Sequence, residues 1–314
     1  MCYSAQIEAD YQKLLRAFGP VLSLEDFTRL WLRDNGKARD RLPKGIIDTV
    51  GPLLPAEAQA AFLDGFAADE QAWTEELFKQ RKRLADNERK LAAKYTKTAE
   101  REVGIAGRRI EQLKRWLDDL RPRSLTARDW DFFPQWYAPV MVREGDRYVI
   151  KPMRYQLRKP GLPASSDWVG EGAKRRLSGT YNARRDNLGR YWRNQFGYTH
   201  GVVVIDTFME NVENEAGEKY RLRFTPRTGE PMFVACLWAN WVDPDGVEPD
   251  LLSFAAVTDD PEPEVAAAGH DRTIINIKPE HVEAWLNPDP KNLQALYDIF
   301  DDKQHPFYEH RTAA

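Results

Sequence analysis

The chain has few cysteines, no long apolar run and little net charge. Its two cysteines, Cys2 and Cys236, stand far apart in 314 residues, which argues against a disulfide framework and fits a reducing compartment. No stretch approaches the ~18 apolar residues of a membrane span, so we expect no membrane partner. A net charge of −3 does not indicate a nucleic-acid binder, so any such site must be a local basic patch.

The N-terminus lacks the pattern of a secretory signal. Cys2 is followed by Ser4, Gln6 and Glu8 rather than by a basic and then an apolar run. We therefore expect a cytoplasmic protein. The length allows a sizeable core, either as one large domain or as a domain with a major insertion.

The first two residues carry unusual chemistry. Aminopeptidases remove Met1 when the second side chain is small, so the mature chain should begin at Cys2. That leaves an α-amine with a pKa of about 8 beside a thiol with a pKa of about 8.5. The amine can condense with an aldehyde, and the thiolate can close onto the imine to give a thiazolidine. Taken alone, Cys2 is equally an ordinary residue at a frayed terminus.

Residues 1–8 favour a short strand or extended arm, and the chain then shows helical periodicity to about residue 125. Helix is expected from Ala56 to about Val103, a break at Gly104 and Gly107, and a second helix to Leu120. An apolar seam at heptad spacing predicts that the two helices pack as a hairpin: Leu77, Leu84 and Leu91 with Ile110, Leu113 and Leu117.

The segment from Lys79 to Arg115 holds thirteen Lys and Arg against five Asp and Glu. This excess is either a phosphate-facing surface or a solvated helix face with pairs at four-residue spacing, such as Asp86 with Lys90 and Glu111 with Arg115.

After Pro122 the pattern becomes that of short strands separated by Gly, Pro, Asn and Asp. The expected strands are 137–142, 148–150, 201–205, 220–224, 232–238 and 252–257, with a turn at 214–217 and helices at 279–286 and 293–300. Cys236, inside an apolar run, is expected in the core. This half is predicted to be an antiparallel α+β domain.

Four short polar stretches interrupt this half: 181–184, Arg190 in GRYWR, 206–210 and 269–272. Each has an ordinary explanation as a turn or surface residue. In order along the chain, with Cys2, they resemble the SRAP family, named for SOS-response-associated peptidase, whose members protect abasic sites in single-stranded DNA. The resemblance rests on Met1-Cys2, Asn182-Ala183-Arg184, Glu210 at the end of a strand leading from Asp206, and His270-Asp271-Arg272, with Arg190 ahead of Glu210.

The resemblance implies an α+β fold with a curved, barrel-like antiparallel sheet, flanking helices and a DNA cleft, to which this chain adds a long helical hairpin. We expect the family domain to comprise 1–10 and 125–314 and the insertion 11–124. The implied function is an abasic-site sensor that cross-links covalently to ring-opened sites in single-stranded DNA through a thiazolidine on Cys2. The chemistry resembles that of an abasic-site lyase, with possible self-processing peptidase activity, and the location would be at the nucleoid.

The resemblance also implies roles for the site residues. Glu210, if buried, would have a raised pKa and exchange protons as the sugar ring opens. Asn182 would orient the amine through its carbonyl, and His270 would stabilise an alkoxide or shuttle a proton. Phosphates would bind three arginines, and bases would stack on aromatics such as Trp192 and Tyr181. The arginines are Arg184, Arg190 and Arg272. No cofactor or metal is expected, since the His and Cys spacings show no zinc pattern.

The sequence departs from the family at several points. Tyr3-Ser4 replaces the usual Gly-Arg after the cysteine, and the segment 154–158 replaces a Trp-bearing stretch that parts DNA strands. Two other classes of function stay open: a thiol peptidase or hydrolase with Cys2 as N-terminal nucleophile, and a non-catalytic nucleic-acid binder. The helical insertion could bind DNA, a partner protein or a second copy of the chain.

Overall fold

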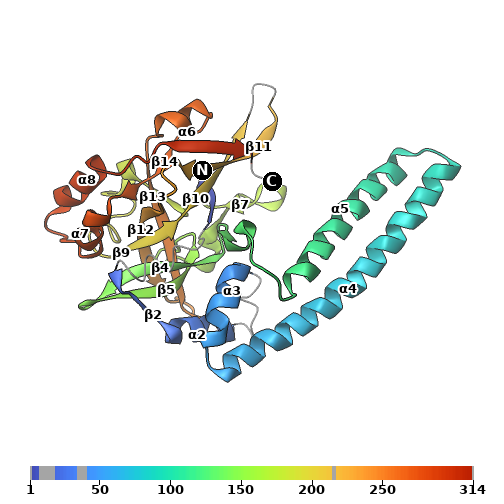
Figure 1. Cartoon of the computed structure of the whole chain (residues 1–314), viewed down its shortest axis with the longest axis horizontal. Coiled ribbons are helices and arrows are strands. Elements are labelled where there is room, and N and C mark those ends of the chain that lie inside the picture. The colour runs from blue at the N-terminus through green and yellow to red at the C-terminus, as the bar shows by residue number, and fades with distance from the viewer. Residues whose placement is uncertain (1, 7–17, 34–40, 214–216, 313–314) are drawn as a thin grey trace. The chain divides into compact units, whose positions relative to one another are not determined.

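The computed structural model describes residues 2–6, 18–33, 41–213 and 217–312 (Figure 1). The predicted turn at 214–217 lies mostly outside these residues. The chain forms two compact units: one comprises 1–27, 41–47 and 126–314, and the other comprises 28–40 and 48–125. The expected domain boundaries near residues 10 and 124 stay a prediction. The two units differ from it because 18–27 and 41–47 belong to the β-rich unit.

A closed barrel of five strands forms the centre of the β-rich unit. Its strands are β4 (Tyr137–Glu144), β5 (Arg147–Tyr155), β9 (His200–Ile205), β12 (Met232–Trp241) and β13 (Leu251–Asp259). Antiparallel pairs run in the order β13, β12, β9, β4 and β5, and a parallel pair of β5 with β13 closes the ring. The α+β fold with a barrel-like core is therefore confirmed, and the parallel closure makes the barrel mixed.

Short strands extend this barrel at the edges of β12, β13 and β5. β8 (Asn182–Arg184) runs parallel to β13, β14 (Thr273–Ile274) pairs antiparallel with the end of β13, and β15 (Asn276–Ile277) pairs with β12. β2 (Val21–Leu22) runs parallel to β5. A separate two-stranded sheet is formed by β6 (Trp168–Val169) and β7 (Arg176–Leu177).

A second, antiparallel sheet carries the N-terminal arm. Its order is β16 (Tyr308–Thr312), β11 (Lys219–Pro226), β10 (Thr207–Glu213), β1 (Cys2–Gln6) and β3 (Asp131–Phe132). The expected N-terminal strand is thus confirmed as β1, a central strand of this sheet. Because β9 leads directly into β10, one chain segment joins the barrel to the second sheet.

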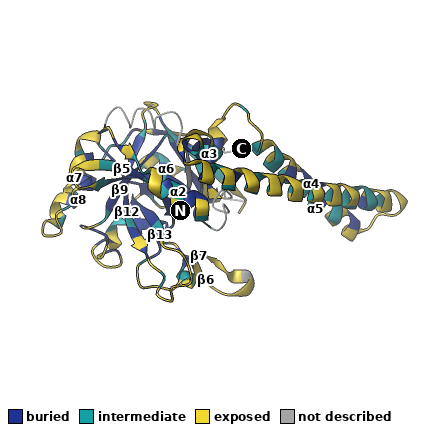
Figure 2. Cartoon of the chain, turned by 90° about the horizontal axis from the view of Figure 1, so that it is seen from below, coloured by how far each residue is buried: buried dark blue, intermediate teal, exposed yellow. Residues whose placement is uncertain are grey.

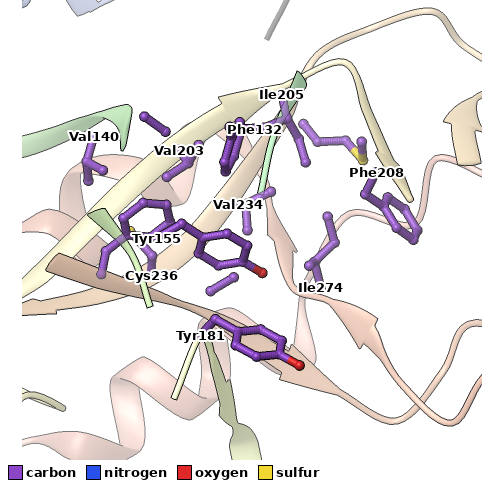
Figure 3. Close-up of a cluster of buried hydrophobic side chains, with 14 of the residues drawn as sticks. Phe132, Val140, Tyr155, Tyr181, Val203, Ile205, Phe208, Val234, Cys236 and Ile274 are labelled. Atoms are coloured by element: carbon purple, nitrogen blue, oxygen red, sulfur yellow. The ribbon is translucent and has the colours of Figure 1, made fainter. Parts of the chain in front are cut away.

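One hydrophobic cluster fills the β-rich unit (Figure 3). It draws on the barrel through residues such as Val140, Val203 and Val234, and on the second sheet through Phe208 and Phe224. Cys236 is fully buried in it, as expected, and burial raises the pKa of its thiol far above the usual range. This cysteine is therefore an inert core residue.

The long helices are α4 (Ala56–Ala93) and α5 (Lys97–Asp119), which lie side by side in Figure 1. Leu77, Ile110 and Leu113 form their buried contact, with Leu84 and Leu117 partly buried, so the predicted hairpin is confirmed. Figure 2 shows the outer faces of this hairpin largely exposed.

The expected position of the break between these helices was wrong. The chain turns at 94–96, where the Thr96 side chain accepts a hydrogen bond from the Ala99 amide and caps α5. Gly104 and Gly107 lie inside α5 because the tertiary packing around Ala106, fully buried, overrides their low helix propensity.

The shorter helices are α2 (Leu24–Leu32), α3 (Lys44–Val50), α6 (Pro263–Ala267), α7 (Val282–Leu286) and α8 (Leu293–Asp301). A 3-10 turn that begins at Pro279 precedes α7, as the proline at that position indicates. Among the described residues, no helix combines the length and the apolar character that crossing a bilayer requires.

Candidate active site

The register of β1 against β10 brings the N-terminus to Glu210. Cys2 lies opposite Glu210, and Ser4 lies opposite Met209. Two residues of β1 therefore face one step of β10, so that Tyr3 is the extra residue of a β-bulge. This bulge sets which residue of β1 stands opposite the carboxylate.

Glu210 is completely buried, in the middle of β10. We expected Glu210 at the end of a strand leading from Asp206. That strand does follow Asp206, but it continues beyond Glu210 to Glu213. The apolar side chains of Phe208 and Val212 hold this strand in the core on either side of Glu210. The charged form of a carboxyl group at such a position is costly to bury unless it is paired or hydrogen-bonded.

His270 is placed beside Glu210 by the end of α6. Gly269, with φ of +88°, donates its N–H to Ala266 O, and the His270 N–H donates to Val265 O. These two bonds form a Schellman motif, in which glycine adopts the left-handed conformation that ends the helix. The His270 Nε2 then lies 3.2 Å from Glu210 Oε2.

The other ring nitrogen of His270 fixes its protonation. Nδ1 lies 3.0 Å from the Arg272 carbonyl oxygen, which can only accept, so Nδ1 carries a hydrogen. Burial lowers the pKa of His270 and favours the neutral ring. In that form Nε2, which faces Glu210, is the basic nitrogen.

Asn182 begins β8, opposite Ala256 of β13. It is nine-tenths buried, and its Oδ1 accepts a hydrogen bond of 3.3 Å from the Tyr155 hydroxyl. Its Nδ2 is also buried and has no hydrogen-bond partner among the described residues. A buried amide nitrogen with this geometry can donate to a bound molecule.

The segments that carry these three polar residues share one core. Tyr181 directly precedes Asn182, Phe208 lies two residues before Glu210, and Ile274 lies four residues after His270. All three apolar side chains belong to the cluster shown in Figure 3. The core therefore holds β8, β10 and the start of β14 in a fixed relation.

The arginines of the candidate site differ in their surroundings. Arg184 is half-buried and pairs with Asp186 and Asp260 at 3.1 and 2.9 Å. Arg272 donates to both oxygens of Asp271, and that bond lowers the pKa of Asp271 far below its usual range. Arg190 is exposed. Their assignment to phosphates stays a prediction, and a phosphate must displace a carboxylate from two of them.

The expectation that Trp192 and Tyr181 stack on DNA bases was wrong. Trp192 and Tyr181 are 3% and 4% exposed, because both face the core rather than a groove. Sequence reasoning also missed Tyr155 as a partner of Asn182. The only signal in the sequence was a Tyr in the segment 154–158, where the SRAP family has a Trp-bearing stretch. In the structure, β5 and β8 both pair with β13, and this brings the side chains of Tyr155 and Asn182 together.

Within the described residues, His, Cys, Asp and Glu form no group of three or more suited to a metal ion.

Comparison with known proteins identifies one family. The model of the family SRAP, SOS response associated peptidase, matches residues 105–312, more than half of the chain. A comparison with curated proteins gave no match.

Among solved structures, a protein from Bordetella bronchiseptica has 18% identity and a TM-score of 0.48, covering 62% of this chain and 90% of that chain. One from Bacteroides thetaiotaomicron has 13% identity and a TM-score of 0.44, covering 59% and 78%. A phage-related protein from B. bronchiseptica has 17% identity and a TM-score of 0.44, covering 62% and 85%.

The barrel and the second sheet define an α+β protein in which a buried contact between a carboxyl group and a histidine lies beside the N-terminal strand. The chain belongs to the SRAP family. It is accordingly a protein associated with the response to DNA damage, and one that binds DNA in the general sense that this family implies.

Proposed function

We propose that this chain cross-links covalently to ring-opened abasic sites in single-stranded DNA through Cys2, after removal of Met1. The observation that carries the proposal is the register that sets Cys2 opposite Glu210, with His270 at 3.2 Å from that carboxyl group. Opposed residues of an antiparallel pair have Cα atoms about 5 Å apart. The backbone of Cys2, and with it the amine that removal of Met1 would free, is therefore close to the strand position of Glu210, which supports the proposal.

The overall reaction joins an aldehyde and an aminothiol and releases one water. The neutral Cys2 amine adds to C1 of the open sugar, and loss of water gives an imine. The thiolate then adds to the imine carbon, and the imine nitrogen takes a proton. No electrons are exchanged with a third component, so no oxidant or reductant is required.

Glu210 and His270 supply the proton transfers. An abasic sugar is mostly a closed hemiacetal, so one group must protonate the ring oxygen while another removes the hydroxyl proton. A protonated carboxyl group at Glu210 donates, and the neutral Nε2 of His270 accepts. Their 3.2 Å separation lets the pair return the proton between steps.

Asn182 binds the oxygen of the sugar in this proposal. Its Oδ1 already accepts from Tyr155, whereas its buried Nδ2 is a donor that the described residues leave unused. We therefore assign Nδ2 to the aldehyde or hydroxyl oxygen, in place of the expected contact between its carbonyl and the amine. Tyr155 holds the amide in the required orientation.

The test is the rate of cross-linking to an oligonucleotide with one abasic site, compared between Glu210→Gln and Glu213→Gln. Both carboxylates lie on β10, but Glu213 is exposed at the strand end. Loss of a general acid–base group should slow the reaction ~10²–10⁴-fold in the first variant only. Equal rates for both variants would remove Glu210 from the mechanism.

The family description names a peptidase, so the same site could instead attack a carbonyl with the Cys2 thiolate. That reaction needs no aldehyde. The two functions are distinguished by reducing the abasic aldehyde to an alcohol. If the reaction product of the protein is the same with the reduced DNA, the reaction does not use the aldehyde, and hydrolysis replaces cross-linking as the proposed function.

A further inference from the structure

The helix α5 carries a row of four cations along one side. Lys97, Arg101, Arg108 and Arg115 are spaced by four, seven and seven residues. At about 100° per residue, all four lie within about 40° of one another around the helix axis. The row is ~27 Å long at a rise of ~1.5 Å per residue. We call these four residues the basic row.

The basic row lies opposite the packed face of α5. The buried residues Ala99, Ala106, Ile110 and Leu113 cluster about 160–220° away from Lys97 around the helix. Packing against α4 therefore directs the row away from the hairpin contact. All four cations are exposed.

These cations form no close ion pair among the described residues, unlike their neighbours. Arg83 pairs with Glu102, Arg89 with Asp86 at 3.3 Å, and Lys114 with Glu111 at 2.7 Å. In this part of the chain Asp86 and Glu111 each contact the residue three positions away instead of the expected Lys90 and Arg115. Arg115 keeps a weaker electrostatic attraction to Glu111.

The positive charge of the chain is concentrated in one segment. The segment 79–115 has a net charge of +8 in a chain of −3, so the remaining residues together carry −11. A polyanion is therefore attracted to this segment and repelled by the rest on average.

We propose that the basic row binds the phosphate backbone of a DNA strand that lacks any abasic site. A membrane surface fits less well, because surface-bound helices insert an apolar face, and that face of α5 is already closed against α4. Three of the four cations, Arg101, Arg108 and Arg115, carry guanidinium groups suited to bidentate phosphate contacts. The inference is independent of the cross-linking chemistry.

The test compares two double variants of the full chain that remove equal charge from the hairpin. Arg101→Gln with Arg108→Gln takes two members of the basic row, whereas Arg89→Gln with Lys114→Gln takes two paired cations. Binding to long, undamaged single-stranded DNA is measured by fluorescence anisotropy over a salt series. Each lost phosphate contact should lower the salt slope by about 0.7, so the row variant should bind about 25-fold more weakly at 0.1 M salt.

Three readouts decide the outcome. A loss confined to the row variant, with unchanged thermal unfolding and unchanged cross-linking to a short abasic oligonucleotide, supports the proposal. Equal losses in both variants would mean that net charge alone attracts DNA, and no loss in either would mean that the row binds something else. If vesicles of anionic lipid, but not DNA, lose binding in the row variant, the partner is a membrane and the proposal is wrong.

Discussion

Replacement of Asp167 by Asn should destabilise the β-rich unit more than any surface change. The Asp167 side chain is 4% exposed and holds two guanidinium groups. Arg154 donates to both of its oxygens at 2.7 and 2.9 Å, and Arg158 donates at 2.6 and 3.3 Å. An amide at this position removes the negative charge and turns an N–H donor toward the arginines.

The expected loss of stability follows from the buried charges that the substitution leaves without Asp167. Arg154 and Arg158 are 4% and 7% exposed, and Arg154 also donates to the Gln156 carbonyl oxygen. Among the described residues the variant leaves these two buried charges with one carboxylate partner, Glu248 on Arg158, which is 46% exposed. Breaking a buried ion pair from one side costs about 3–5 kcal/mol, whereas an exposed pair contributes about 0–1 kcal/mol. The matched control Glu248→Gln should therefore change stability little.

Urea unfolding followed by tryptophan fluorescence measures both variants. Burial alone would raise the pKa of Asp167, but hydrogen bonds from Arg158 and Arg154 lower it below the usual value. A depressed carboxyl pKa gives stability that is present above the unfolded pKa of about 3.9 and lost as the pH falls through the folded one. The difference between wild type and Asp167→Asn should shrink in acid. A cost under 1 kcal/mol at pH 7 would refute this reasoning.

Three further predictions concern single side chains. Tyr155→Phe should slow cross-linking about tenfold, the worth of one hydrogen bond to Asn182, with DNA affinity unchanged; an unaltered rate would show that Asn182 needs no positioning. Arg184→Ala and Arg272→Ala should each weaken single-strand binding by ~1–3 kcal/mol and reduce its salt dependence, and constant affinity at low and moderate salt would make them structural. Burial lowers the pKa of His200 to about 3, so the folded state stays neutral while the unfolded state binds a proton below about pH 6.5. Stability should fall by about 1.4 kcal/mol per pH unit below 6.5, and His200→Gln should flatten this slope in urea unfolding.

The strands and the hairpin were predictable because their patterns are local. Alternating or continuous apolar runs gave β4, β9, β12 and β13 near their observed bounds. The seam of Leu77 with Ile110 and Leu113 followed from helical spacing alone. The parallel pair of β5 with β13 was not predictable, since it joins segments about a hundred residues apart and leaves no local pattern.

The sequence indicated two residues that the structure brings into contact, but not the geometry of that contact. The order of the polar stretches indicated Glu210 and His270, yet only the Schellman motif at Gly269 shows why they meet. The burial of Trp192 was missed because an aromatic residue in a polar stretch reads equally as core or surface. Tyr155 was missed because a hydroxyl bond across two strands has no sequence spacing of its own.

The most direct test of the thiazolidine mechanism is the intact mass of the protein after incubation with single-stranded DNA carrying one abasic site. The mechanism predicts loss of Met1 and a product equal to protein plus DNA minus one water, stable to heating in denaturant. Cys2→Ser should give only an imine that borohydride can trap, and Cys2→Ala should give no stable product. An equally stable product from Cys2→Ala would contradict the thiazolidine mechanism.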